Sequence, residues 1–186
     1  KETLASFFEI TASLSAHTRF EPLLQSVVLE TMKIAQAQAG LIYLTDNDGP
    51  EFALKGLIIG DQAQDLGIVQ RSPIHADARD YPQWLRTLRQ GSDSVVCTLN
   101  LEQSGDLRPV LQALDTHSAH LLGIRLHNRH GETVGILVLL LNNSGSNEDR
   151  EHLRADRIAF IQAVSGAAAV SIESQRLQER QKQLLD

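Results

Sequence analysis

A short polar segment flanked by two apolar runs dominates residues 118–142. The incoming run covers residues 121–126 and the outgoing run covers residues 134–141, and Gly131 between them can adopt the positive φ of a tight turn. The outgoing run is too short to span a membrane, so the pattern predicts a β-hairpin whose second strand is buried. Because that strand is apolar on both faces of its pleat, other elements must cover both faces of the sheet.

The order of the remaining segments predicts an α+β fold. Apolar residues recur at helical spacing in some segments and form short β-type runs in others. With the hairpin, these runs predict a central antiparallel sheet of about five to six strands, with long N- and C-terminal helices on one face and short helices and loops on the other. We expect a ligand pocket between this loop layer and the sheet. The expected helices cover residues 3–16, 23–38, 81–89, 107–114 and 147–183, and the other expected strands cover residues 41–45, 52–59, 68–74 and 94–99, with a polar loop over residues 60–67.

Composition and charge argue against several classes of function. The chain has 186 residues, of which 42% are hydrophobic, enough for one globular domain with a core. Its net charge is −6 and no Lys/Arg-rich run occurs, so neither a nucleic-acid partner nor direct membrane insertion is expected. The single cysteine, Cys97, excludes an intramolecular disulfide and fits a reducing compartment, which predicts a cytoplasmic location. The chain begins at Lys1 in a helical pattern, and we interpret it as a piece of a longer protein.

The last predicted helix, over residues 147–183, is too long for its own domain to cover. It would measure about 54 Å at a rise of ~1.5 Å per residue, whereas a compact domain of this size is roughly 40 Å across. Its sequence becomes polar after Ile172, yet apolar residues continue at the seven-residue spacing of a coiled-coil seam. We therefore predict a parallel homodimer. The residues predicted to form its seam are Leu4, Phe7, Leu14, Val170, Leu177 and Leu184.

The residues expected to line a pocket come from the loop layer and from the strands beside it. Trp84, the single tryptophan, either closes over a ligand or fills the core between helix and sheet. Arg125 either pairs with an acid, holds an anionic ligand or reaches solvent at the sheet edge. The predicted pocket residues are Tyr81, Trp84, Arg125, His75 and Val96.

No residue pattern indicates catalysis or a metal centre. A metal site usually needs roughly three to four ligands, and the pleat of the predicted strand would place His120 and His127 on opposite faces. A haem ligand such as His75 or His120 is an open alternative. Cys97 lies in mid-strand, where an inert thiol is expected. Without a nucleophile–base pair or a carboxylate pair, this chain is not expected to be an enzyme, and no cofactor is predicted beyond an unknown small-molecule ligand.

The order of these segments resembles the GAF domain family over nearly the whole chain. The resemblance implies a regulatory sensor that binds a small molecule or transmits a signal by dimerising. One departure is Arg125, where many members of the family have Pro. The similar segments are Leu23-Leu24 with Val27-Val28 in the opening helix, AGLIYLTD at residues 39–46, LGIRL at residues 122–126, GETVGILVL at residues 131–139, and the closing helix over residues 158–174.

Specialised GAF chemistries are not supported by the residues present. Some GAF-like domains attach a bilin through a cysteine, but Cys97 has no adjacent histidine. Others reduce methionine sulfoxide with paired cysteines, and this chain has only one. The charged signature of the cyclic-nucleotide-binding members is also not found, and no phosphate-binding glycine-rich loop occurs. The resemblance therefore implies a sensor without naming its ligand.

The polar tail over residues 173–186, which ends in QKQLLD, is similar to connectors that lead into HD-GYP cyclic-di-GMP phosphodiesterase domains of bacterial signalling proteins. The resemblance implies an N-terminal connector or dimer helix at residues 1–17, a GAF-like sensory domain at residues 18–172, and a signalling-helix linker at residues 173–186 to a covalently linked output domain. A histidine kinase or a nucleotide cyclase would use a comparable helix. The alternative is therefore a ligand-free dimerisation module of such a protein.

Overall fold

The structure, a computed structural model, describes residues 20–45, 52–69, 82–143 and 154–185. The predicted first helix lies outside these residues, as do Leu4, Phe7, Leu14, His75 and Tyr81. The described helices and strands are α2 (Phe20–Ala35), β1 (Ala39–Thr45), β2 (Phe52–Ile59), β3 (Gln62–Ala63), α3 (Gln83–Arg89), β4 (Ser94–Asn100), α4 (Arg108–Ala113), β5 (Ser118–His127), β6 (Thr133–Asn142) and α6 (Ala155–Leu185), with 3-10 turns at Leu66–Ile68, Leu101–Gln103 and Gly105–Leu107.

The described strands form one antiparallel six-stranded sheet in the order β3-β2-β1-β6-β5-β4. The predicted hairpin is confirmed as β5 and β6, and β6 lies in the middle of the sheet. Its residue Leu137 pairs with Ile42 of β1 on one side and with Ile124 of β5 on the other. The α+β class is therefore confirmed, with the most apolar strand at the centre.

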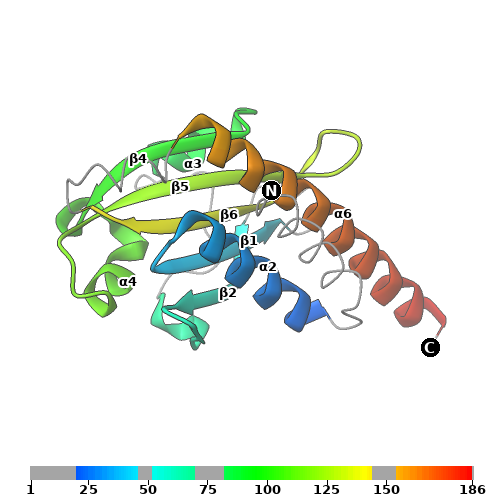
Figure 1. Cartoon of the computed structure of the whole chain (residues 1–186). Helices are drawn as coiled ribbons and strands as arrows, with labels where there is room; N and C mark the ends of the chain where they lie inside the picture. The colour runs from blue at the N-terminus through cyan, green and yellow to red at the C-terminus, as the bar shows by residue number, and fades with distance from the viewer. Residues whose placement is uncertain (1–19, 46–51, 70–81, 144–153, 186) are drawn as a thin grey trace.

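Helices cover both faces of this sheet, as the two-sided apolar pattern of β6 requires. Helices α2 and α6 lie on one face, whereas α3, α4 and the 3-10 turns lie on the other (Figure 1). Alternate residues of β6 divide between the two cores: Leu137, Leu139 and Leu141 pack with α2 and α6, and Ile136, Val138 and Leu140 pack with α3 and α4.

The turn between β5 and β6 is built around Asn128 and Gly131. Gly131 has φ +81°, as expected of the glycine in this turn, and its N–H donates to the carbonyl of Asn128 at 3.1 Å. The side-chain oxygen of Asn128 accepts from the backbone N–H groups of His130 at 2.9 Å and Glu132 at 3.0 Å. These three bonds give the exposed tip of the hairpin a defined shape.

Two local predictions were wrong at element boundaries. Residues 60–67 were expected to be loop, but Gly60, with φ +69°, reverses the chain so that β3 pairs with the end of β2. Most of the strand expected over residues 68–74 lies outside the described residues; Ile68 itself ends the 3-10 turn Leu66–Ile68, which the side chain of Asp65 caps. Helix α6 begins at Ala155 rather than near residue 147.

Candidate functional site

A cavity of about 330 Å³ lies in the predicted loop layer, between α3, β4 and the 3-10 turns that follow β4. We call it the loop-layer cavity. Its walls come from residues 82–87 around α3, residues 95–99 of β4 and residues 103–106 of the 3-10 turns. Its volume falls at the low end of the range for small-molecule sites in proteins, about 300–1,000 Å³.

Residues of α3, β5 and the 3-10 turns explain how this layer is positioned on the sheet. Helix α3 buries Trp84, Leu85 and Leu88 against the sheet. Gly123 of β5 makes room for this packing, because a Cβ there would lie 2.9 Å from a methyl of Leu88. On the opposite wall, buried Ser104 donates to the carbonyl of Leu101 at 2.8 Å and so closes the 3-10 turn.

The loop-layer cavity has one charged side chain among the described residues that line it. Half-buried Asp106 is its carboxylate, and no Lys, Arg or His is among the described residues that line it. Burial raises the pKa of the Tyr43 phenol above its ordinary value of 10.0, and the charge of Asp106 raises it further. The Tyr43 hydroxyl is buried and has no hydrogen-bond partner among the described residues. Burial also raises the pKa of the Cys97 thiol, so this cysteine is not an activated nucleophile.

The structure places the predicted pocket residues in three different situations. Trp84 lines the loop-layer cavity and, at 6% exposure, packs in the core beside it, whereas its contact with a ligand stays a prediction. Val96 was misplaced: it pairs with Leu122, which packs with the α2/α6 core, and its side chain is 44% exposed at the sheet edge. The strand period explains the error, because Val95 and Cys97 on either side face the cavity.

Arg125 also does not line the loop-layer cavity. Its guanidinium forms an ion pair with Asp93 at 3.1 Å and donates to the carbonyl of Gly131 at 3.0 Å and to the hydroxyl of Thr133 at 3.3 Å. The ion pair was one of the alternatives that the sequence left open. Arg125 therefore braces the end of the hairpin rather than holding a ligand.

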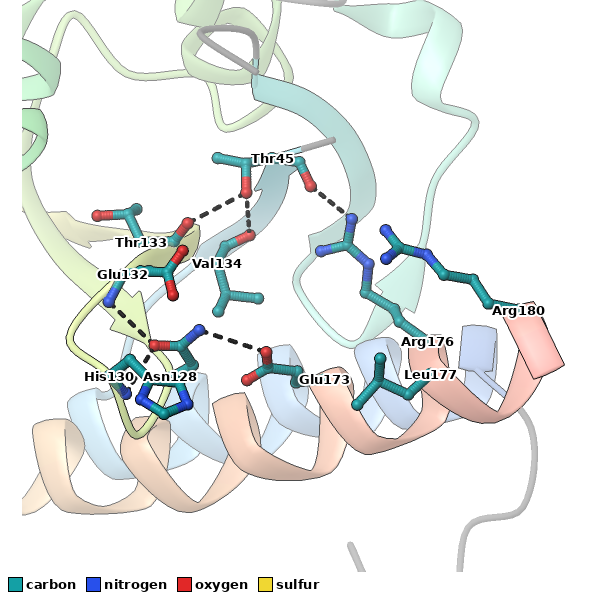
Figure 2. Close-up of a pocket in the computed structure, with 10 residues that line it drawn as sticks. All are labelled: Thr45, Asn128, His130, Glu132, Thr133, Val134, Glu173, Arg176, Leu177 and Arg180. Atoms are coloured by element: carbon teal, nitrogen blue, oxygen red, sulfur yellow. Dashed lines mark hydrogen bonds between the residues drawn. The ribbon is translucent and has the colours of Figure 1, made fainter. Parts of the chain in front are cut away.

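A second cavity, of about 280 Å³, lies where α6 passes the tip of the hairpin (Figure 2). We call this region the helix junction. The turn over residues 128–134, Thr45 at the end of β1, and α6 residues 173–180 line it. Figure 2 shows Glu173, Arg176 and Arg180 reaching from α6 toward the hairpin and the end of β1.

Polar contacts hold α6 to the sheet at the helix junction. The amide of Asn128 donates to Glu173 at 3.3 Å, and the guanidinium of Arg176 donates to the carbonyl of Thr45 at 2.7 Å. The hydroxyl of Thr45 also contacts the carbonyl of Val134 at 3.0 Å. No periodic pattern predicted these contacts, because their partners lie far apart in the sequence.

Helix α6 changes character along its length. Up to Ile172 it is fixed by an apolar stripe in the α2/α6 core, as predicted. The predicted seam residues lie outside that stripe, with Val170 38%, Leu177 51% and Leu184 86% exposed. By length and composition the helix could also cross a membrane: it contains an 18-residue window of mean hydropathy 1.2, of which 33% is buried in the domain, where the stripe packs in the α2/α6 core.

Comparison with known proteins identifies the fold. The profile of the GAF domain matches residues 19–172. No curated protein matches the sequence. Among solved structures, the chain is similar to the GAF domain of a phosphoenolpyruvate-protein phosphotransferase from Coxiella burnetii (20% identity, TM-score 0.66, 96% of each chain covered). It is also similar to the A. aeolicus nlh2 GAF domain (15% identity, TM-score 0.61, 89% of this chain and 94% of that chain).

A third solved structure of this fold is the GAF domain/HD domain protein from Geobacter sulfurreducens (19% identity, TM-score 0.57, 88% of this chain and 98% of that chain). At these identities the structural likeness establishes the fold alone. The family profile, in contrast, covers most of the chain and agrees with the sheet order, the helix layers and the α+β class described above. The chain belongs to the GAF domain family, whose members are sensory and regulatory modules of signalling proteins.

Proposed function

We propose that this chain is a small-molecule-sensing GAF domain that acts as a homodimer and passes its signal through α6 to a C-terminal output domain. A ligand in the loop-layer cavity would bias the packing of α3 and the 3-10 turns on the sheet. The sheet would pass that bias to α6 through the helix junction, and paired α6 helices would carry it onward.

The observation that carries this proposal is the exposed apolar stripe of α6. Val170, Leu177 and Leu184 recur every seven residues and are 38%, 51% and 86% exposed, and the last two lie on the part of the helix that extends past the α2/α6 core. Apolar residues at this spacing on an uncovered helix are the pattern by which two helices associate in a coiled coil. A second copy of the same helix is the occupant that this stripe fits best, because the seam would be self-complementary.

For the output domain, we propose an HD-GYP cyclic-di-GMP phosphodiesterase. The tail over residues 173–186 is similar to connectors of that class. A neighbour in fold, from Geobacter sulfurreducens, bears the name GAF domain/HD domain protein. The fold itself does not select the output, since GAF neighbours also come from a phosphotransferase and from a sensor histidine kinase of Pseudomonas syringae pv. tomato. The connector sequence is therefore what supports this choice.

Sedimentation equilibrium of the chain tests the dimer. We expect a dimer at micromolar concentration, and a monomer for the double variant Leu177→Ser/Leu184→Ser. The matched control is Glu179→Ser/Lys182→Ser, which introduces the same number of serines at exposed positions on the face of α6 opposite the seam, leaves the net charge unchanged and should remain dimeric. A wild-type chain that stays monomeric at high micromolar concentration would overturn the proposal, as would a double variant that associates as strongly as the wild type.

A further inference from the structure

Strand β4 is the last described strand at one edge of the sheet, and it lacks the features that usually protect such an edge (Figure 1). Its seven residues, SVVCTLN, include no charged residue and no proline, and its pairing with β5 runs without a bulge. Edge strands of soluble proteins commonly carry charges, prolines or bulges, or are very short, so that other chains do not pair with them. The described strand at the opposite edge, β3, has only two residues.

The backbone groups of β4 alternate between its neighbour β5 and the outer edge of the sheet. Just before the strand, the carbonyl of Asp93 accepts from the N–H of Arg125 at 2.9 Å, and just after it the N–H of Leu101 bonds in the same direction. Such bonds recur at every second residue of an antiparallel pair, so the odd-numbered residues of β4 bond to β5. The N–H and C=O groups of Val96 and Thr98 therefore point outward, where no described residue bonds to them.

The side chains of β4 show that this edge is accessible. On the α2/α6 side of the sheet, the side chain of Val96 is 44% exposed and Thr98 is exposed beside it. On the other side, Val95 and Cys97 are half-buried and line the loop-layer cavity. An added strand would therefore meet apolar side chains on both faces of β4.

We propose that β4 is a docking site for an extended peptide segment of a partner protein, which adds to the sheet as a further strand antiparallel to β4. A row of outward N–H and C=O groups is complementary to the backbone of another extended chain, and the bonds between them supply the affinity. The segment carries β-branched residues opposite Val96 and Thr98, because such residues pair well across antiparallel strands. This docking site depends neither on the proposed ligand nor on the proposed dimer.

The size of the edge selects a peptide rather than a second folded copy of the chain. A strand of this length spans about 24 Å and a sheet is roughly 10 Å thick, so rigid contact along the edge buries on the order of 500 Å² in total. A stable complex of two folded proteins buries at least about 1,200 Å². A flexible peptide escapes this limit, because its alternate side chains settle on both faces of β4.

Amide hydrogen exchange of the full chain, read by NMR, tests the docking one residue at a time. The probe is the peptide acetyl-Lys-Thr-Val-Thr-Val-Thr-Lys-amide at about 1 mM. In the free chain, the amides of Val95 and Cys97 should be protected by their bonds to β5, whereas those of Val96 and Thr98 should exchange fast. With the probe bound, exchange at Val96 and Thr98 should slow by at least about tenfold, as for a site about nine-tenths occupied.

The variant Val96→Pro removes one outward N–H and leaves every bond to β5 in place, and edge strands tolerate proline at such positions. It should bind the probe at least about tenfold more weakly than the wild type in an NMR titration. The matched control Val96→Thr keeps the N–H and the β-branched shape, so it should bind as the wild type does. A probe whose central threonine is replaced by proline should not bind to any of these chains.

Three results would overturn the proposal. The first is exchange at Val96 and Thr98 that the probe leaves unchanged, a reading on the wild-type chain that holds even if Val96→Pro does not fold. The second is a folded Val96→Pro variant that binds the probe as tightly as the wild type. The third is protection of these two amides in the free chain that rises with protein concentration, which would place a second copy at this edge.

Discussion

Asn128 at the tip of the central hairpin donates from its side-chain amide to the carboxylate of Glu173 on α6, across 3.3 Å of space and 45 residues of chain. The side-chain oxygen of the same amide accepts hydrogen bonds from two backbone N–H groups of the turn. One side chain therefore shapes the tip of the hairpin and attaches it to the helix that we propose transmits the signal. The integrity of the turn and the position of α6 are coupled through this residue.

Replacing Asn128 tests this coupling. Asn128→Ala removes both acceptor bonds of the turn and the contact with Glu173, and we expect the free energy of unfolding to fall by about 1–3 kcal/mol. Asn128→Asp keeps an acceptor for the turn but places a carboxylate beside Glu173, so it should lose less stability than the alanine variant while still releasing α6. Urea unfolding measures the first effect. His130→Ala, an exposed position in the same turn, is the control and should change stability by no more than about 0.5 kcal/mol.

Arg176 should control the mobility of the second half of α6. Arg176→Gln removes the charge-assisted bond to the carbonyl of Thr45, so amide hydrogens beyond Ile172 should exchange faster. Amides of residues 161–168 should keep their protection, because the apolar core holds that part of the helix. Hydrogen exchange read by mass spectrometry resolves the two segments.

The control for Arg176 is Arg180→Gln, which removes the same charge one turn later. No hydrogen bond or ion pair of Arg180 is found within the part of the chain that the structure describes, so its loss should leave exchange near the wild-type rate. Equal acceleration by both variants would mean that charge on the helix, and not the bond to Thr45, determines its mobility.

Shortening a side chain at the centre of the sheet should lower the free energy of unfolding far more than shortening one at its edge. Leu137 is fully buried between β1, β5 and the helices, so Leu137→Ala should cost about 2–5 kcal/mol of unfolding free energy. Val96→Ala, at a half-exposed position of edge strand β4, should cost less than about 1 kcal/mol. Urea unfolding of both variants makes the comparison, and similar losses for the two would contradict the sheet order.

Stability should fall at alkaline pH, partly through Cys97. Burial raises the pKa of its thiol above the ordinary value of 9.0, so the folded chain retains this proton where the unfolded chain loses it. The contribution of the protonated thiol to stability is therefore fully present below pH 9.0 and is lost as the pH rises further. Cys97→Ala should lose less stability than the wild type between about pH 7 and about pH 10. Identical pH dependence of the two chains would show that the thiol titrates alike in both states.

The sequence was most informative where an element carries its own pattern. The apolar run of β6 predicted a buried central strand and two covering layers, and the stripe ending at Ile172 predicted how α6 packs. Both depend on periodic burial, which the order of residues expresses directly. The part of the loop-layer cavity that residues 103–106 line was not foreseen, because these residues form aperiodic 3-10 turns whose direction only the fold determines.

Contacts between residues far apart in the sequence could also not be predicted. The bond between Arg176 and Thr45 joins positions 131 residues apart, and that between Arg125 and Asp93 joins positions 32 residues apart. The sequence left an ion pair open for Arg125 without naming its partner, and gave no sign of the contact of Arg176, because only the fold brings these partners together. The misplacement of Val96 has the opposite origin: it was assigned to the right strand, but a period of two leaves its face undetermined without the neighbouring strand.

Because different interactions hold the two parts of α6, different solution conditions should loosen them. The segment before Ile172 is held by apolar packing, which added salt strengthens slightly and cooling weakens. The segment after it is held at the helix junction by hydrogen bonds between the charged side chains of Glu173 and Arg176 and neutral groups, and dissolved ions at high concentration compete for those charges. High ionic strength should therefore free the end of the helix that we propose leads to an output domain, while the domain beneath it stays folded. The ionic composition around the protein then becomes an input in its own right.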